Sequence, residues 1–314
     1  MDIQYLLWLQ DLRAATGGMF DEFFNALSKF AVEVVPFLPF VVFWCADKKW
    51  GYRFLISEEI GEVATGMIKL TVCAYRPWIR SELINPAGDS KVAATGYSFP
   101  SGHTLVATVN YGTTIAWQRD RRRWLAVLCG VLIGLTGFSR NFLGVHTPQD
   151  VAVGFLVSVV IILAVGAVQK KAEGNEKIKD ALTFAGILVV VVSLVFIMTK
   201  SYPMDIVDGK LLVDPQKMMN DSFRSSGGAL GFLIGSYLDR HYQKYEIPTG
   251  AAQLPLLSCI GIAIMFGWMR YFAPATIVAA LGSHWGNLIA YFIMMVFAMS
   301  VWPMVITKTC RNGA

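Results

Sequence analysis

Charged residues are scarce in this sequence. Asp, Glu, Lys and Arg together make up 16% of its 314 residues, whereas soluble domains contain about 25%. Hydrophobic residues account for 55% of the chain. Apolar runs of about 17 to 25 residues recur, which is the length that crosses a bilayer as a helix. The composition therefore excludes an ordinary soluble domain and predicts an all-α fold, a polytopic helical bundle embedded in a membrane.

Cysteine pairs and acidic clusters are also missing. The five cysteines are scattered and none forms a C-x-x-C pair, so neither a zinc site nor a disulfide framework is indicated. No cluster of Asp and Glu offers a magnesium site, and we expect no metal and no cofactor. The net charge of +5 comes from basic residues that flank the apolar runs, and we therefore expect no nucleic-acid partner.

About nine apolar segments are long enough to span a membrane. We interpret residues 1–22 as an interfacial amphipathic segment, residues 23–180 as a core that contains the motifs described below, and residues 181–314 as additional transmembrane helices. The predicted spans cover residues 24–45, 52–73, 101–118, 125–138, 151–168, 181–198, 227–238, 254–271 and 275–301.

Basic residues indicate how these spans are oriented. Under this count the basic clusters all fall on one side of the membrane, which the positive-inside rule makes the cytoplasmic side. They lie at residues 48–49, 119–123, 170–171, 240 and 308. The loops after the second and fourth predicted spans then face away from the cytoplasm.

A histidine and a carboxylate stand four residues apart at the mouth of an apolar segment. On a helix His146 and Asp150 share a face. A carboxylate bonded to one imidazole nitrogen leaves the other nitrogen free to attack. Arg140, shortly before His146, has the planar fork that suits phosphate oxygens. This pattern indicates phosphoryl chemistry with a histidine nucleophile.

The same stretch is also typical of a helix start. Thr147 can cap a helix, Pro148 fits the first helical position, and Asp150 stands where the acid of a capping box stands. Taken alone, this stretch leaves both interpretations open.

Two cations lie near the outer end of the second predicted span. Lys69 and Arg76 are seven residues apart, which is about two helical turns, so they project from one face. Pro77 marks the end of that helix. The two cations can clamp an anion, and the alternative is that both side chains reach the membrane interface for solvation alone.

The sequence Phe99-Pro100-Ser101-Gly102-His103 opens the third predicted span. Free N–H groups at a helix start attract phosphate. Gly102 permits close approach to the backbone, Ser101 adds a donor, and His103 can protonate a departing oxygen. The alternative is an ordinary turn before a helix.

Together the three stretches resemble the type 2 phosphatidic acid phosphatase superfamily. The pattern of that family is K-x6-R-P, then P-S-G-H, then S-R-x5-H-x3-D. Every signature position is present here with the family's spacing, between Lys69 and Asp150, which is about a quarter of the chain.

The resemblance implies a metal-independent membrane phosphatase with a core of about six spanning helices. It implies that His146 forms a phosphohistidine, that Asp150 orients His146, and that His103 protonates the leaving oxygen. Water then hydrolyses the intermediate. The phosphoryl oxygens would be held by Lys69, Arg76, Ser101, Gly102 and Arg140.

The preferred substrate class is a lipid phosphate or lipid pyrophosphate, whose tail stays in the bilayer. We expect a multi-pass protein of a bacterial cytoplasmic membrane with its site facing outside. A soluble phosphate ester also stays open as a substrate, as in the glucose-6-phosphatase branch, which likewise has about nine spans but from which Asp150 sets this sequence apart. Two further functions stay open, a transporter of phospholipid or isoprenoid phosphates and a catalytically silent lipid-binding scaffold.

Several features stay open at this level, including the lipid headgroup, the role of residues 181–314, the oligomeric state and the source organism. Glu58, Glu59 and Glu62 form either a polar network beneath the site or a proton path. Glycines recur at every fourth residue and predict close helix packing. They are Gly130 and Gly134, then Gly227, Gly231 and Gly235, and finally Gly282 and Gly286.

Overall fold

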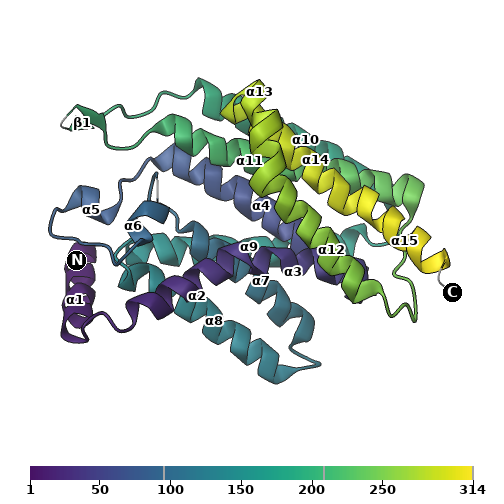
Figure 1. Cartoon of the computed structure of the whole chain (residues 1–314), viewed down its shortest axis with the longest axis horizontal. Coiled ribbons are helices and arrows are strands. Elements are labelled where there is room, and N and C mark those ends of the chain that lie inside the picture. The colour runs from purple at the N-terminus through teal and green to yellow at the C-terminus, as the bar shows by residue number, and fades with distance from the viewer. Residues whose placement is uncertain (95, 208, 313–314) are drawn as a thin grey trace. The chain divides into compact units, whose positions relative to one another are not determined.

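The computed structural model describes residues 1–94, 96–207 and 209–312, and its regular structure is almost entirely helical (Figure 1). The longer helices are α1 (Asp2–Ala15), α2 (Asp21–Glu33), α4 (Lys48–Val72), α7 (Gly102–Gln118), α8 (Arg123–Phe142), α9 (Pro148–Ala172), α10 (Glu176–Thr199), α11 (Pro215–Leu238), α12 (Leu254–Gly267), α14 (Ser283–Val296) and α15 (Trp302–Asn312). The shorter elements are α3 (Leu38–Val41), α5 (Pro77–Arg80), α6 (Ser90–Ala93), α13 (Ala279–Leu281) and the strands β1 (Ile206–Val207) and β2 (Lys210–Leu211).

Within the described residues, six helical runs are long and apolar enough to cross a membrane. They are Asp21–Ala46, Arg123–Phe142, Pro148–Ala172, Glu176–Thr199, Leu254–Leu281 and Ser283–Arg311. The predicted class, an all-α polytopic membrane protein, is confirmed. The second, third and seventh predicted spans form the helices α4, α7 and α11 but are not among the six. The helix α7 has only 17 residues, and α4 and α11 carry many polar and charged side chains. The count of about nine spans therefore stays a prediction.

The predicted boundary between the last two spans is wrong. We expected a break before residue 275, but the helical run continues through Pro274 to Leu281. Wide π turns at Trp268–Phe272 and Pro274–Val278 make this possible, because proline has no N–H and its ring crowds the preceding turn of a tight helix. The chain breaks instead at Gly282, where φ is +79°, a conformation that glycine adopts without strain.

The chain forms two compact units. Unit 1 comprises Met1–Pro36, Ala64–Leu163 and Lys200–Met218, and unit 2 comprises Phe37–Val63, Ala164–Thr199 and Met219–Ala314. Both units are therefore discontinuous in sequence. The predicted division at residues 22 and 180 stays a prediction, because compactness alone does not show which segment carries which function.

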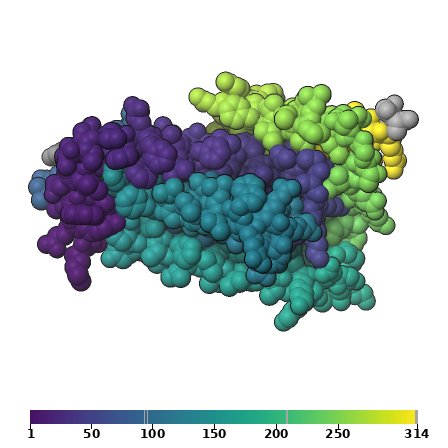
Figure 2. All heavy atoms as spheres, turned by 90° about the horizontal axis from the view of Figure 1, so that it is seen from below, coloured from purple at the N-terminus to yellow at the C-terminus, as the bar shows by residue number. Residues whose placement is uncertain are grey.

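Unit 1 is built around α7 and α8, which pack along each other, with α2 against both. Figure 2 shows the purple N-terminal residues lying against the teal residues of this region. Leu6 and Leu9 of α1 are buried in a cluster with Phe142, Leu143 and Val145. This apolar contact supports the turn that directly precedes His146.

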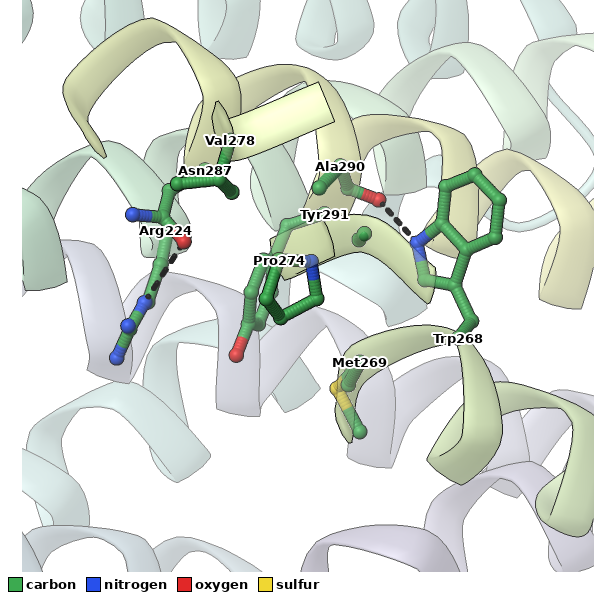
Figure 3. A pocket seen from close by; sticks show the side chains of 9 residues that line it. Arg224, Trp268, Met269, Pro274, Val278, Asn287, Ala290 and Tyr291 are labelled. Carbon is green, nitrogen blue, oxygen red and sulfur yellow. Dashed lines mark hydrogen bonds between the residues drawn. The ribbon is translucent and has the colours of Figure 1, made fainter. Parts of the chain in front are cut away.

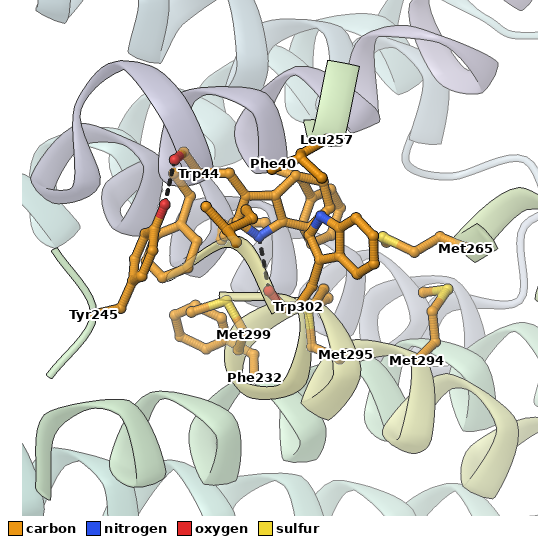
Figure 4. Close-up of a cluster of buried hydrophobic side chains, with 14 of the residues drawn as sticks. Phe40, Trp44, Phe232, Tyr245, Leu257, Met265, Met294, Met295, Met299 and Trp302 are labelled. Atoms are coloured by element: carbon orange, nitrogen blue, oxygen red, sulfur yellow. Dashed lines mark hydrogen bonds between the residues drawn. The ribbon is translucent and has the colours of Figure 1, made fainter. Parts of the chain in front are cut away.

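Unit 2 has an aromatic and methionine-rich core, which Figure 4 shows around Trp44 and Trp302. Trp44 Nε1 donates to the carbonyl of Ala298 at 2.9 Å, so its polar atom is satisfied inside the core. In α11, a Cβ on Gly227 would lie 2.1 Å from the Leu288 carbonyl oxygen. A Cβ on Gly231 or Gly235 would also clash with a neighbouring helix. The predicted close packing of these three glycines is confirmed.

Candidate active site

All the predicted site residues lie in unit 1, at the ends of four helices. Lys69 is in the last turn of α4, and Arg76 follows that helix. The residues 101–103 start α7, Arg140 is in the last turn of α8, and the turn between α8 and α9 carries His146. Helix ends offer unpaired backbone groups and a local dipole, so these positions suit an anion site.

His146 lies between a carboxylate and a guanidinium group. Its Nδ1 is 3.3 Å from Asp150 Oδ2, and its Nε2 is 2.8 Å from Arg76 Nη1. Arg76 can only donate, so Nε2 accepts and the proton of the neutral imidazole is on Nδ1. Burial, together with the positive charges of Arg76 and Lys69, holds the pKa of His146 well below its usual value of 6.5. The arrangement leaves the basic lone pair on Nε2.

Asp150 also closes the capping box of α9. Its Oδ2 accepts the Thr147 N–H at 2.8 Å, and its own N–H donates to Thr147 Oγ1 at 3.3 Å. The predicted helix start is therefore confirmed. The two interpretations of this stretch are compatible, because the oxygen that caps the helix is the oxygen that faces His146.

The turn before α9 is held by backbone and side-chain hydrogen bonds. The N–H groups of Val145 and His146 both donate to the Arg140 carbonyl, at 3.1 and 3.2 Å. Asn141 Nδ2 donates to the His146 carbonyl at 2.9 Å. Gly144 has a φ of +74°, which allows the chain to reverse here. The backbone of the turn is thus set by its own sequence.

Lys69 and Arg76 are buried and bound to carbonyl groups of one neighbouring segment. Lys69 Nζ donates to the Tyr97 carbonyl at 2.8 Å, and Arg76 Nε donates to the Gly96 carbonyl at 3.0 Å. Arg76 Nη1 also donates to the Val145 carbonyl at 2.9 Å. Burial lowers the pKa of Arg76 to about 10, so its guanidinium group still carries a charge at neutral pH.

Arg140 has an unused donor. Its Nη1 donates to Ser28 Oγ at 2.7 Å, but its buried Nε has no hydrogen-bond partner among residues 1–94, 96–207 and 209–312. A buried unpaired donor is costly, and a ligand oxygen would satisfy it. Without the histidines, the three cations Lys69, Arg76 and Arg140 and the one carboxylate Asp150 sum to +2, which matches a phosphate dianion.

The start of α7 packs closely on α9. Ser101 is the N-cap residue, and its N–H donates to the Asp150 carbonyl at 3.0 Å. A Cβ on Gly154 would lie 2.8 Å from the Ser101 carbonyl oxygen, so only glycine permits this approach. A Cβ on Gly102 would meet a methyl group of Thr65 at an ordinary 3.7 Å. His103, in the first turn of α7, interacts electrostatically with Arg140, His146, Arg76 and Lys69.

Three side chains of this site are not among the residues predicted from the sequence. Ser98 Oγ donates to Asp150 Oδ2 at 2.5 Å and is 3.4 Å from His146 Nδ1. The other two are Ser28, which accepts from Arg140, and Asn141, which donates to the His146 carbonyl. In the sequence, Ser98 stands next to the motif that begins at Phe99, and Asn141 stands next to Arg140. These positions draw attention to the two residues but do not indicate which groups they bind.

An apolar groove of about 370 Å³ lies between α8 and α9. Built Cβ atoms on Gly130 and Gly134 would meet nothing within 4 Å among the described residues. The predicted role of these two glycines in close helix packing is therefore wrong, because they face the groove instead. The groove is lined by Thr104, Gly130, Ile133, Gly134, Gly137, Phe138, Asn141, Pro148, Val151, Ala152 and Phe155.

Unit 2 holds a smaller cavity of about 50 Å³ (Figure 3). At its edge Arg224 Nε donates to Asn287 Oδ1 at 3.2 Å, and Trp268 Nε1 donates to the Ala290 carbonyl at 2.9 Å. Glu58, Glu59 and Glu62 also belong to unit 2, where Glu59 lies beside Gly228. Their predicted roles as a polar network or a proton path stay predictions.

The chain combines helices that are long and apolar enough to cross a membrane with a buried cluster of His146, Asp150 and Arg76 at helix ends. Residues 51–173 match the sequence model of the PAP2 superfamily, and this stretch contains all of the predicted site residues. The predicted resemblance to this family is confirmed over residues 51–173, which are less than half of the chain.

Named relatives support the same family. An undecaprenyl-diphosphatase of Sulfolobus acidocaldarius is 29% identical over 133 residues, which is 42% of this chain and 62% of the relative. Phosphatidylglycerophosphatase B of Escherichia coli is 37% identical over 70 residues, 22% of this chain and 27% of the relative. Lipid phosphate phosphatase delta of Arabidopsis thaliana is 26% identical over 185 residues, 55% and 42% of the two chains. Each match spans less than two thirds of the relative's length. No solved structure matches the chain.

Proposed function

We propose that this protein is a metal-independent membrane phosphatase that hydrolyses a lipid phosphate or lipid pyrophosphate through a phosphohistidine. The observation that carries the proposal is the position of His146, whose Nδ1 faces Asp150 and whose Nε2 faces Arg76. This arrangement holds a neutral imidazole with its lone pair among cations that attract a phosphoryl group. The family match over residues 51–173 supports it.

The reaction divides into two displacements at phosphorus. Nε2 of His146 forms the P–N bond as the P–O bond to the leaving group breaks, which is the lipid alcohol of a monophosphate or the lipid monophosphate of a pyrophosphate, and His103 gives a proton to the leaving oxygen. Water then attacks the phosphohistidine and gives its proton back to His103, which releases inorganic phosphate and restores His146. Asp150 stabilises the positive charge on the imidazole in the intermediate.

The phosphoryl oxygens require several donors, because charge develops on them during both displacements. We assign this role to the N–H groups and the hydroxyl at the start of α7 and to the cations around His146. The orphaned Nε of Arg140 supports the assignment. The proposed binding residues are Lys69, Arg76, Ser101, Gly102 and Arg140.

The groove between α8 and α9 supports a lipid substrate. Its lining is mostly apolar, and it includes two polar residues beside the site: Asn141, which binds the His146 carbonyl, and Thr104, which donates to Ser101 Oγ at 2.9 Å. We propose that one hydrocarbon chain of the substrate occupies this groove. The relatives named above as acting on undecaprenyl diphosphate and phosphatidylglycerophosphate support the same substrate class.

The site is proposed to face outside a bacterial cytoplasmic membrane. The exposed basic loop at residues 119–123 lies at one end of α7, and the candidate site lies at the other end. The positive-inside rule assigns that loop to the cytoplasm. A substrate would then reach the site from the outer leaflet.

The test is phosphate release by the detergent-purified protein in excess EDTA. The substrates are phosphatidate, phosphatidylglycerol phosphate, an isoprenoid pyrophosphate and glucose 6-phosphate. We expect a lipid substrate to be hydrolysed and His146→Ala to lower kcat by about 1000-fold or more. The matched control is His241→Ala, which removes one of the two partners of Asp180 in unit 2, the other being Arg240, and should leave kcat within about twofold.

The outcomes distinguish the candidate functions. Activity that requires a divalent cation, or that survives His146→Ala, would overturn the mechanism. Preference for glucose 6-phosphate would favour a soluble phosphate ester as the substrate. Movement of labelled lipid across vesicles without phosphate release would favour a transporter.

A further inference from the structure

The segment Lys200–Met218, which we name the strap, lies beyond the stretch that matches the family but belongs to unit 1. It contains the antiparallel strands β1 and β2, in which Ile206 pairs with Leu211. Among the described residues, three contacts join the strap to the last turn of α4 or to the chain between α4 and α7. Each contact is adjacent to Lys69 or Arg76, or to the carbonyl groups that bind them.

The first contact is at the end of α4. Lys200 Nζ donates to the Leu70 carbonyl at 2.7 Å and lies 3.4 Å from Cys73 Sγ. A cation at the last carbonyls of a helix is favourable because these carbonyls carry partial negative charge. The carbonyl that Lys200 binds belongs to the residue next to Lys69.

The second contact is a hydrogen bond from the Tyr75 hydroxyl to Asp205 Oδ2. Burial and this hydrogen bond raise the pKa of Tyr75 to about 12, so the phenol remains a donor across the physiological range. The ring of Tyr75 also packs against that of Tyr97, with centroids 6.3 Å apart. Tyr75 directly precedes Arg76 in the chain, and Tyr97 provides the carbonyl that binds Lys69.

The third contact is the close packing of Met218 against Gly96. Met218 is 4% exposed, and a Cβ on Gly96 would lie 1.6 Å from its Sδ. The thioether therefore rests directly on the backbone of Gly96, whose carbonyl accepts the Arg76 Nε–H at 3.0 Å. Displacing Met218 would free the segment that aligns Arg76.

We propose that the strap positions Lys69 and Arg76 for phosphate binding, with Asp205 and Met218 as its positioning residues. This inference rests on the proposed phosphatase function. Lys69 and Arg76 are long side chains that lose conformational freedom when they are held at a site. The strap supplies the packing that fixes their carbonyl partners, and a chain that ended before residue 200 would lack it.

The experiment compares variants of the full-length protein. Asp205→Ala and Met218→Ala remove the two contacts, whereas Asp205→Asn keeps an acceptor for Tyr75 and Met218→Leu keeps the volume. Val207→Ala is the matched control, because Val207 is an exposed residue of the hairpin. The measurements are kcat, KM, the Tm and the inhibition constant of orthovanadate, which imitates phosphate.

We expect Asp205→Ala and Met218→Ala to weaken orthovanadate inhibition by about 10-fold or more, because small displacements of binding groups have large effects. Asp205→Asn, Met218→Leu and Val207→Ala should stay within about threefold of wild type. The inhibition constant is independent of the fraction of folded enzyme, so a lower Tm alone does not change it.

Two outcomes count against the proposals and are distinguishable. An active wild type whose orthovanadate inhibition is unchanged in Asp205→Ala and Met218→Ala would overturn the role of the strap. A folded wild type that releases no phosphate from any substrate of the panel would overturn the proposed function, and the strap inference with it.

Discussion

Asp150 Oδ2 is the atom on which the proposed site converges. It accepts from the Thr147 N–H and from Ser98 Oγ, and it faces His146 Nδ1. The capping bond fixes the carboxylate to the rigid first turn of α9, so the imidazole is oriented before any substrate binds. A preorganised carboxylate needs no rearrangement when positive charge develops on His146.

Ser98→Ala tests this convergence. A hydrogen bond to a charged group contributes about 1.5–3 kcal/mol, and about 1.4 kcal/mol corresponds to a tenfold change in rate. We therefore expect kcat to fall about 10-fold or more, with little change in KM. The control is Ser158→Ala, which removes a buried serine of α9 that bonds to the Leu105 and Gly154 carbonyls. An unchanged kcat in Ser98→Ala would contradict the role of Ser98.

The protonation of His146 is a second prediction at this scale. Burial and the nearby cations depress its pKa, so His146 should be neutral, with the proton on Nδ1, at pH 6.5. Histidine NMR with nitrogen-15 labels can test this, because the chain has four histidines and His146→Gln identifies the signal. An imidazolium signal from His146 at pH 6.5 would contradict the prediction.

The same pKa shift affects stability, and its sign follows from linkage. Below about pH 6.5 the unfolded chain protonates this histidine while the folded chain does not. The unfolded state then binds more protons, so the contribution of His146 to folding stability falls as the pH falls from 6.5 towards the depressed folded pKa. Above 6.5 both states are neutral and the contribution is constant.

At the scale of helices, glycine has opposite uses in α8 and α11. The glycines of α11 bring its backbone against a neighbouring helix, whereas Gly130 and Gly134 of α8 face open space. The two helices α8 and α9 approach each other closely near Gly137, where a Cβ would lie 3.0 Å from Val151 Cγ1. Gly130 and Gly134 line the groove that we assign to the lipid chain.

Gly134→Leu should fill that groove. We expect kcat/KM for a long-chain lipid phosphate to fall about 10-fold, because the side chain competes with hydrocarbon for the same volume, while a short-chain substrate changes by less than about threefold. The measurement is kcat/KM against chain length. The control is Gly267→Leu in α12 of unit 2, where a Cβ also meets nothing within 4 Å among the described residues. Equal losses for long and short chains would contradict the assignment.

At the scale of the whole molecule, the orientation in the membrane decides which lipids the site can reach. Glu82 lies in the exposed loop after α5, and Arg121 lies in the exposed loop between α7 and α8. The loop that contains Glu82 precedes the third predicted span, and the loop that contains Arg121 follows it. The positive-inside rule places the Arg121 loop, which is basic, in the cytoplasm. The proposed outward-facing site therefore requires Glu82 to be outside.

Cysteine labelling tests this orientation. In a protein whose exposed Cys259 is replaced by serine, we expect Glu82→Cys to react with a membrane-impermeant maleimide in intact cells. Arg121→Cys should react only after the cells are permeabilised. The reverse pattern would place the site on the cytoplasmic side.

The sequence by itself determined the membrane class, the family resemblance of residues 51–173 and the helix start at residues 147–150. These features depend on apolar runs and on residues close together in the chain, such as Thr147 and Asp150, which are coupled by the local geometry of one helix turn. The same locality places His146 beside Asp150. The length and hydrophobicity of a segment, and the spacing of residues within one helix turn, can be read directly from the sequence, and so these features could be predicted.

Only the tertiary structure decided which distant groups meet. Ser98 reaches Asp150 across 52 residues, Ser28 reaches Arg140 across 112, and Tyr75 reaches Asp205 across 130. The structure likewise distinguished the groove glycines of α8 from the packing glycines of α11. No spacing rule predicts these contacts, because they depend on the faces that helices turn towards one another after they pack.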